Sequence, residues 1–327
     1  MLVLGLNGSP RKKGNSEYLL TQFLRQAEKR GFETRVVNCG AHEYQPCIGC
    51  GSCEKKGVCF HKDALADEVF SLFRRADVLV LSGPVYFYSF PSQIKAIIDR
   101  TQTLWSRKYR FGLGDPGEGQ RKGVLLCCGA TRGENLFDGI KLTARYFFDA
   151  AGAEFTDHLW YRRVDERGEI QKMPGVKGDI TELGDRVLTS LEGKLRICFV
   201  CTENAGRSQM AAGFARHMAG KDLDVASAGS QPADSINNTV VEAMAEKKLD
   251  IAFLKPRKIQ SVLNTFTPQV MVTMGCSDAC PVVPGAKVVN WDLPDPKDSS
   301  LAEVRKIRDE IEKKVSLLCR ELTNNSL

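Results

Sequence analysis

Short apolar runs alternate with amphipathic stretches along the first half of the chain. Each apolar run has the length and composition of a buried strand, and we predict strands at residues 2–6, 34–37, 78–82 and 123–127. Helical stretches separate these runs, for example at residues 16–30 and 92–100. Strands that alternate with helices predict an α/β fold, in which a parallel sheet is covered by helices on both faces.

The same pattern starts again near residue 194. Residues 180–191 predict a closing helix, and residues 192–194 have the composition of a linker. Later strands are predicted at residues 196–201, 224–227, 269–274 and 287–290, before an amphipathic helix at 300–322. A length of 327 residues also favours about two domains, at ~150 residues each. We therefore expect two open, parallel-sheet, three-layer α/β domains, at residues 1–193 and 194–327.

Composition excludes some classes of function. The net charge of +6 is modest, and no basic cluster is interleaved with aromatic residues, so we expect no nucleic-acid partner. No segment approaches the ~18 consecutive apolar residues of a membrane-spanning helix. The apolar N-terminus lacks the cationic region that opens a secretory signal. We expect a cytoplasmic protein with no membrane partner.

The twelve cysteines change this picture, because they are many for a cytoplasmic protein and they cluster. The groups are Cys47, Cys50, Cys53 and Cys59; Cys127 and Cys128; Cys198 and Cys201; Cys276 and Cys280. Clusters in a reducing compartment indicate metal or redox chemistry more than a disulfide framework. The first group contains enough thiolates to surround an iron–sulfur cubane, with zinc or free thiols as alternatives. Cys39, Cys127 and Cys128 are most simply buried thiols.

Two segments of the first half are typical of cofactor binding. The stretch GSPRKKGNS follows the first strand and opens a helix, so its amides and the side chains of Ser9, Arg11 and Ser16 can bind a phosphate. A simple capped strand–helix turn is the alternative. Aromatic residues follow the strand at 78–82, where open α/β sheets hold planar cofactors, although core packing would also explain them.

Together, GSPRKKGNS and PVYFYSFPSQIKAIIDR resemble the NAD(P)H-dependent FMN reductases of the flavodoxin-like group, over residues 1–190. The cysteine loop closely resembles that of the iron–sulfur flavoproteins, which implies that Cys47, Cys50, Cys53 and Cys59 ligate a [4Fe–4S] cluster. The resemblance implies FMN phosphate binding by Ser9, Arg11, Asn15 and Ser16. It places Pro84, Val85, Tyr86, Phe87 and Ser89 beside the flavin ring, with Gly129, Ala130 and Thr131 as a third flavin loop. It also implies NAD(P)H as the electron donor, and a homodimer or higher oligomer formed through this domain.

In the second half, a strand leads into Cys201, five intervening residues, Arg207, Ser208 and a helix. Five residues can curl so that their amides point at one centre, while Arg207 grips two oxygens of a tetrahedral oxyanion. The same dipoles favour the thiolate of Cys201, and Ser208 can donate a hydrogen bond to it. We therefore expect a phosphate-like substrate, either a phosphate monoester or arsenate.

This half resembles the low-molecular-weight phosphatase family over residues 194–322. Ser227-Ala-Gly-Ser230 resembles its Ser-Ala-Gly turn, and Asp292-Leu-Pro-Asp295-Pro296 resembles its Asp-Pro loop. The match implies that Asp295 is the general acid, with Asp292 as the fallback. The loop around Asn204, followed by Gln209 and Met210, resembles the arsenate reductase version of the family.

Cys276 and Cys280 favour arsenate reduction over hydrolysis, because further thiols can supply two electrons by disulfide exchange. In the best-known thioredoxin-coupled relay the two cysteines lie farther apart, and relatives that use a small thiol are closer in spacing. A structural turn before Pro281 is the alternative. Thioredoxin and small thiols are thus both candidate reductants.

We expect a bifunctional enzyme, an NAD(P)H-dependent FMN oxidoreductase fused to an arsenate reductase with Cys201 as the nucleophile. The fusion suggests that electrons pass from NAD(P)H through the flavin to the cysteines. The alternative is a phosphatase joined to an independent flavin reductase.

Overall fold

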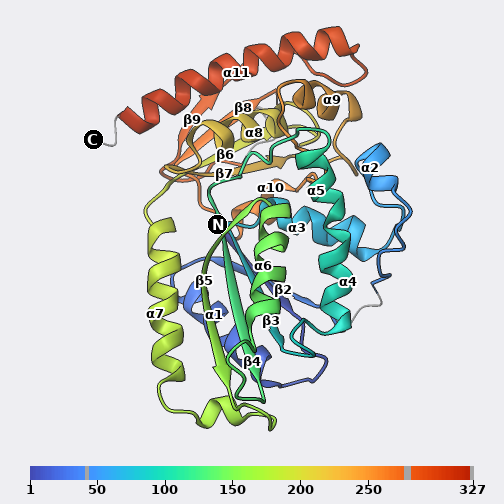
Figure 1. Cartoon of the computed structure of the whole chain (residues 1–327). Coiled ribbons are helices and arrows are strands. Elements are labelled where there is room, and N and C mark those ends of the chain that lie inside the picture. Colours follow the sequence, from blue (N-terminus) through green and yellow to red (C-terminus); the bar gives the residue numbers. More distant parts are fainter. Residues whose placement is uncertain (41–43, 276–280, 325–327) are drawn as a thin grey trace. The chain divides into compact units, whose positions relative to one another are not determined.

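The computed structural model describes residues 1–40, 44–275 and 281–324. The chain divides into two compact units (Figure 1). The first comprises Met1–Gly112 and Gly119–Glu192, and the second comprises Leu113–Glu118 and Gly193–Leu327. No helix among the described residues is long and apolar enough to cross a membrane.

The first unit is built on a five-stranded parallel sheet. Its strands are β1 (Leu2–Asn7), β2 (Glu33–Asn38), β3 (Val78–Pro84), β4 (Arg121–Gly129) and β5 (Ala153–Arg162). Their order in the sheet is β2-β1-β3-β4-β5, the flavodoxin-like order of a doubly wound fold. Because all strands run the same way, the loops that follow β1, β3 and β4 meet at one edge of the sheet.

Helices cover both faces of this sheet, as parallel strands require (Figure 1). The helices are α1 (Asn15–Lys29), α2 (Ser52–Lys56), α3 (Phe70–Arg75), α4 (Ser92–Arg100), α5 (Gln102–Tyr109), α6 (Asp138–Ala150) and α7 (Val176–Leu188). Apolar residues of α1 and α7 share one core with alternate residues of β1, β3 and β4. On the other face, Phe148 of α6 packs against Gly123 of β4, where any side chain would collide with its ring. Alternation along each strand thus divides the core between the two faces.

The edge strand β5 corrects the sequence analysis, which predicted only four strands in this unit. Its sequence, AEFTDHLWYR, has no continuous apolar run, and most of its residues are only half-buried. An edge strand has one neighbour and more solvent contact, so a search for buried runs passes over it. The other four strands lie where the pattern predicted them, within a few residues at each end.

The second unit has a four-stranded parallel sheet of order β7-β6-β8-β9. The strands are β6 (Leu195–Cys201), β7 (Leu223–Gly229), β8 (Val270–Met274) and β9 (Lys287–Asn290). On one face lie α8 (Arg207–Ala219), α9 (Asn238–Glu246) and α11 (Leu301–Asn324), and on the other lies α10 (Ile259–Leu263). The segment Leu113–Glu118 adds a backbone pairing to this unit, because the amide of Gly114 donates to the carbonyl of Lys248 at 2.9 Å.

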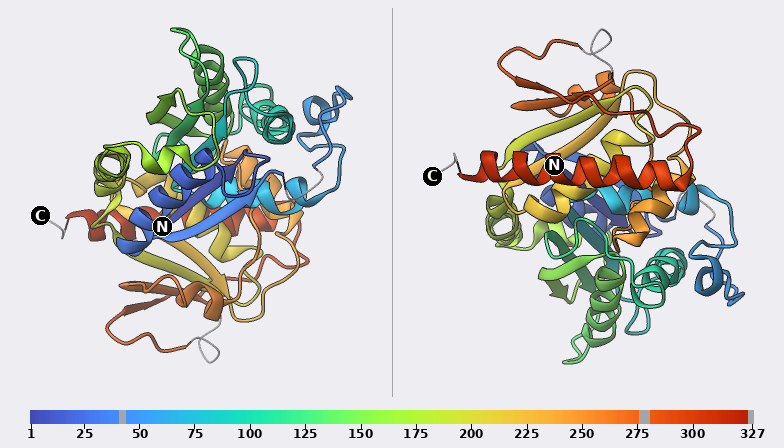
Figure 2. Two further views of the ribbon diagram at one scale, coloured as in Figure 1. Left: turned by 90° about the horizontal axis from the view of Figure 1, so that it is seen from below. Right: turned by 90° about the horizontal axis from the view of Figure 1, so that it is seen from above.

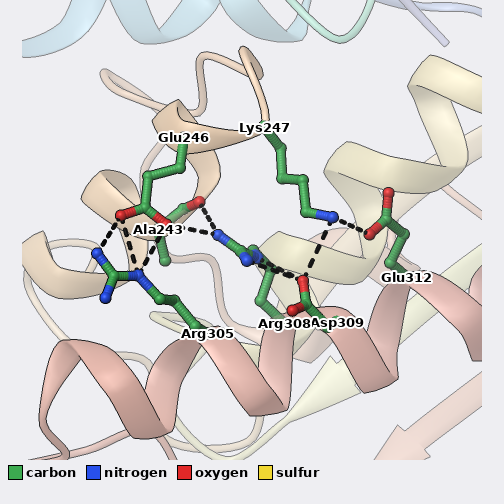
Figure 3. Close-up of polar contacts among 7 residues, drawn as sticks. All are labelled: Ala243, Glu246, Lys247, Arg305, Arg308, Asp309 and Glu312. Atoms are coloured by element: carbon green, nitrogen blue, oxygen red, sulfur yellow. Dashed lines mark hydrogen bonds and ion pairs between the residues drawn. The ribbon is translucent and has the colours of Figure 1, made fainter.

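The long helix α11 is the last described element (Figure 2), and charged side chains join it to α9 (Figure 3). Arg305 binds both carboxylate oxygens of Glu246, and Arg308 binds the same carboxylate at 2.8 Å. Arg308 is buried and also donates to the carbonyl of Ala243 in the last turn of α9, at 2.7 Å. Hydrogen bonds from these two guanidinium groups lower the pKa of Glu246 to about 2. This contribution to stability is therefore present above the unfolded pKa of ~4.3 and is lost as pH falls toward 2.

Replacing Arg308 with methionine is expected to lower the free energy of unfolding by about 1–2 kcal/mol, because a carbonyl at the end of α9 loses its donor. Urea unfolding followed through Trp291 fluorescence, with Trp105 and Trp160 replaced by phenylalanine, would isolate the second unit. Arg305→Met is the matched control: its side chain is largely exposed, so the loss should be much smaller. Equal losses in the two variants would contradict the assignment of Arg308 as a helix cap.

Candidate functional site

The loop between β6 and α8 is shaped for an anion. Every backbone carbonyl from residue 201 to 206 accepts a hydrogen bond, from Ser230, Gln231, Ala233, Gln209, Asn237 and Met210. The backbone N–H groups of residues 203–207 have no acceptor within the described part of the chain. The carbonyls of the loop are thus bonded to neighbouring segments, and its amides, next to the start of α8, remain available to an anion.

Cys201 lies at the end of β6 and is buried. Its sulfur is 3.1 Å from the hydroxyl of Ser208. The side-chain Nδ2 of Asn204 donates to that same hydroxyl at 2.8 Å, so the proton of Ser208 is free to point at the sulfur. The hydroxyl is thus placed to donate a hydrogen bond to the sulfur of Cys201.

Asn204 holds the loop in shape. Its φ of 51° is a left-handed conformation that asparagine tolerates better than most residues. Its side-chain oxygen accepts from the backbone amide of Arg257 at 2.8 Å. Gly229 lies beside it on β7, where a Cβ would come within 2.7 Å of the Thr202 carbonyl oxygen. The Ser-Ala-Gly segment therefore ends in glycine because the anion loop passes too close for a side chain.

Arg207 and Asp295, which the sequence analysis gave separate roles, lie in contact. The guanidinium donates to the Asp295 carboxylate at 2.5 Å and to the Leu293 carbonyl at 3.2 Å. Its Nε is buried and has no hydrogen-bond partner among the described residues. A buried donor without a partner is costly, so a bound oxyanion would satisfy a group that the protein leaves open.

A second ion pair connects the same two loops. Lys297 donates to Glu203 of the anion loop at 2.6 Å, and this carboxylate raises the pKa of Lys297. Pro296 packs over Gly206, where a Cβ would come within 2.5 Å of the proline ring. The fallback acid, Asp292, is exposed. Cys276 and Cys280 lie outside the described residues.

The flavin-binding residues predicted from the sequence converge on one pocket at the carboxyl edge of the first sheet. Nine of the twelve line it, namely Ser9, Arg11, Asn15, Ser16, Pro84, Val85, Tyr86, Gly129 and Ala130. Phe87, Ser89 and Thr131 do not. Five lining residues were missed: Gly14, Cys128, Val164, Asp165 and Arg167. The last three follow the unpredicted strand β5, and no motif marks them in the sequence.

The start of α1 suits the phosphate of a flavin nucleotide. Gly14 is the N-cap residue and supplies no side-chain hydrogen bond to the first turn. A Cβ at Gly14 would lie 3.0 Å from the Ser9 hydroxyl, so the backbone there closes a narrow cradle. An uncapped helix N-terminus with Ser9 and Arg11 beside it provides the donors that an anion needs.

Tyr86 and Ser89 pair with each other across a tight turn, at 2.8 and 2.9 Å. The two central residues, Phe87 and Tyr88, have φ values of 48° and 61°, a conformation that costs aromatic residues energy. Phe87 is fully exposed at the tip. The predicted ring-binding segment therefore places Tyr86 at the pocket and turns Phe87 away into solvent.

The four cysteines of the first cluster also line one pocket. In the described ranges, no group of three or more His, Cys, Asp or Glu side chains lies closely enough together to hold a single metal ion. Four thiolates around a cubane are spaced more widely, because the cluster occupies the centre. His61 and Arg100 line this pocket too, and within the described ranges the buried atoms His61 Nε2 and Arg100 Nε have no hydrogen-bond partner. Cationic and donor groups beside four thiols fit an anionic cluster.

Known protein families match two separate parts of the chain. The family model "NADPH-dependent FMN reductase" matches residues 1–124, and "Low molecular weight phosphotyrosine protein phosphatase" matches residues 196–327. An iron–sulfur flavoprotein of Methanosarcina thermophila is 36% identical over 132 residues, which are 40% of this chain and 65% of that protein. The chain spans 45% to 65% of the length of three such flavoproteins.

The second unit matches shorter proteins almost end to end. A putative arsenate reductase of Halobacterium salinarum is 36% identical over 131 residues, or 38% of this chain and 92% of that protein. Arsenate reductase 2 of Staphylococcus saprophyticus is 37% identical over 126 residues, or 37% of this chain and 94% of that protein.

Proposed function

Because this chain joins an FMN reductase/iron–sulfur flavoprotein domain to a member of the low-molecular-weight phosphatase/arsenate reductase family, we propose that it is a bifunctional redox enzyme. Its second unit reduces arsenate to arsenite, and its first unit is an NAD(P)H-dependent FMN oxidoreductase. The observation that carries the arsenate proposal is Cys201, at the base of a loop whose amides, like Arg207 Nε beside it, have no hydrogen-bond partner among the described residues.

In the first step, the Cys201 thiolate attacks the arsenic of bound arsenate. A sulfur–arsenic bond forms and an arsenic–oxygen bond breaks, while the loop amides and Arg207 stabilise the charge on the remaining oxygens. Asp295 supplies the proton to the departing oxygen. Anion binding would draw the guanidinium of Arg207 toward the oxyanion and weaken its contact with Asp295, which leaves the carboxyl group available for that proton.

In the second step, another thiol resolves the adduct. Its thiolate attacks the Cys201 sulfur, so that a disulfide forms and the sulfur–arsenic bond breaks. The bonding pair stays on arsenic, which leaves as arsenite, and the two thiols have supplied two electrons. We assign the second thiol to Cys276 or Cys280, with a small thiol or thioredoxin as the other source.

The surroundings of Cys201 favour a small inorganic oxyanion over an aryl phosphate. The second unit has no tyrosine, and its other aromatic residues are Phe199, Phe214, Phe253, Phe266 and Trp291. Four of them are buried and Phe253 is half-buried. An aryl leaving group would need an exposed apolar wall, and none of the described residues of this unit supplies an exposed aromatic side chain.

Phosphate monoester hydrolysis is the second candidate, since the same loop, Arg207 and Asp295 suit it and the matching family model is that of a phosphatase. Hydrolysis needs no second cysteine. Replacing Cys276 and Cys280 with serine would leave a phosphatase rate intact, whereas an arsenate reductase that uses either residue would lose its turnover.

In the first unit, the residues around the carboxyl edge fit FMN, and the four cysteines fit a [4Fe–4S] cluster. FMN would supply a two-electron centre that accepts hydride from NAD(P)H, and the cluster would supply a one-electron centre. Ser9, Arg11 and the start of α1 would hold the phosphate, while Val85, Tyr86 and Gly129 would border the ring. Cys47, Cys50, Cys53 and Cys59 would hold the cluster.

The fusion motivates the proposal that NAD(P)H is the final source of electrons for the cysteines of the second unit. Arsenite formation by the purified full-length chain should then proceed with NAD(P)H as the only reductant. If arsenite appears only after thioredoxin or a small thiol is added, the internal route is wrong and the two units act separately.

Cys50→Ser is expected to remove iron from the anaerobically purified protein, because a cubane would lose one of its four thiolate ligands. The flavin absorbance should stay. Iron and sulfide content, with the visible spectrum, measure this. Cys39→Ser is the control, since Cys39 is buried away from the four-cysteine pocket. Wild-type protein with zinc or no metal would contradict the cluster.

A further inference from the structure

The loop that follows β5 is built into the flavin pocket. Val164, Asp165 and Arg167 all line the pocket beside the predicted flavin residues. Arg11 and Arg167 are the two cationic side chains among the lining residues. Arg167 is exposed and has no ion-pair partner in the part of the chain that the structure describes. Its charge is therefore available to a ligand.

Hydrogen bonds fasten this loop to two of the predicted flavin loops. At its start, the amide of Val164 donates to the carbonyl of Gly129 at 3.1 Å, which joins it to the loop after β4. Within it, the Glu169 carboxylate accepts from the amides of Asp165 and Glu166, at 2.7 and 3.0 Å. The start of the loop is thus bonded to the loop after β4, and the Glu169 side chain stabilises the conformation of the loop itself.

Asn15 holds the other end. Its side-chain nitrogen donates to the carbonyl of Glu166 at 2.8 Å, and its side-chain oxygen accepts from the amide of Ile170 at 3.3 Å. The two residues that Asn15 contacts, Glu166 and Ile170, lie on either side of Arg167 in the sequence. The Asn15 side chain is about nine-tenths buried. Both polar atoms of the Asn15 side chain are directed at the loop, although the sequence comparison had placed Asn15 on the phosphate.

We propose that Arg167 binds the FMN phosphate and that Asn15 is a positioning residue that acts through Arg167. The inference rests on the proposed flavin function of the first unit. A guanidinium makes charge-assisted hydrogen bonds to phosphate oxygens, and Arg11 with the start of α1 supplies the other donors. The site is therefore selective for a phosphorylated flavin over the same ring without phosphate.

The test compares FMN with riboflavin, which lacks the phosphate, by quenching of flavin fluorescence on full-length protein freed of its flavin. Arg167→Gln should raise the Kd for FMN roughly tenfold or more and leave the Kd for riboflavin unchanged. Asn15→Ala should also weaken FMN alone, and should add nothing in the Arg167→Gln background because the two residues act in series.

Arg163→Gln is the matched control, because Arg163 is exposed at the start of the same loop but does not line the pocket. Equal losses for FMN and riboflavin, no loss for FMN, or a comparable loss in the Arg163 variant would overturn the role of Arg167. Additive losses for Asn15 and Arg167 would overturn the positioning role. A wild-type chain that binds neither flavin would instead refute the flavin site itself, and with it this inference.

Discussion

Replacing Cys201 with serine is expected to abolish arsenate reduction, by roughly 10³-fold or more, while phosphate binding persists. The serine hydroxyl is a far weaker nucleophile at neutral pH and cannot form the disulfide that releases arsenite. Anion binding should not depend on the sulfur, because on our proposal the loop amides and Arg207 would hold the oxyanion. Binding and chemistry should therefore separate cleanly in this variant.

Two measurements check this prediction: arsenite formation in a coupled assay, and phosphate affinity by titration calorimetry. Cys198→Ser is the matched control. Cys198 lies on the same strand, but it packs in the core on the other face of the sheet. Arsenate reduction that survives in the Cys201 variant would show that the nucleophile lies elsewhere. Loss of phosphate binding with an intact fold would show that the sulfur itself is part of the anion site.

Replacing Arg207 with lysine is expected to weaken phosphate binding about 100-fold. The guanidinium is buried and presents several donors in one plane, whereas an ammonium is a compact point charge. Loss of two charge-assisted hydrogen bonds at about 1.5 kcal/mol each gives a change of this size. Arsenate reduction should fall at least as far, because the same donors stabilise the charge of the adduct.

The Arg207→Lys variant also tests the link to Asp295, since lysine cannot keep both the Asp295 contact and the Leu293 contact in the same geometry. Arg196→Lys is a fair control, because Arg196 is exposed on β6, the strand that leads into the anion loop. A change in phosphate affinity of less than about threefold, under 1 kcal/mol, would mean that the amides alone bind the anion.

Sequence patterns located most of the site because the chemistry is local there. Cys201, Asn204, Arg207 and Ser208 lie within eight residues of chain, so their spacing already determines that they share one loop. Asp295 entered the predicted site only through family resemblance, and its contact with Arg207 was not predicted, since 88 positions separate the two residues. The ion pair between Glu203 and Lys297 could not be predicted in this way. It joins two loops that are 94 positions apart, and no sequence motif indicates such a contact.

In the flavin pocket, too, some lining residues were predicted from the sequence and others were missed. The residues after β1, β3 and β4 could be predicted, because strand–loop–helix patterns identify them and parallel strands bring their ends to one edge. The loop with Arg167 was missed, and so were the hydrogen bonds that join Asn15 to it. These bonds connect residues some 150 positions apart, and local patterns do not encode such contacts.

The sequence by itself determined the two parallel-sheet folds and singled out the candidate nucleophile Cys201, the candidate anion loop, and the candidate flavin and cysteine segments, because periodicity and short motifs are properties of neighbouring residues. Only the tertiary structure decided the edge strand β5, the outward turn of Phe87, the unpartnered Nε of Arg207 and the loop that carries Arg167 into the pocket. These features depend on solvent exposure, backbone conformation and distant hydrogen bonds, which arise only when the chain is folded.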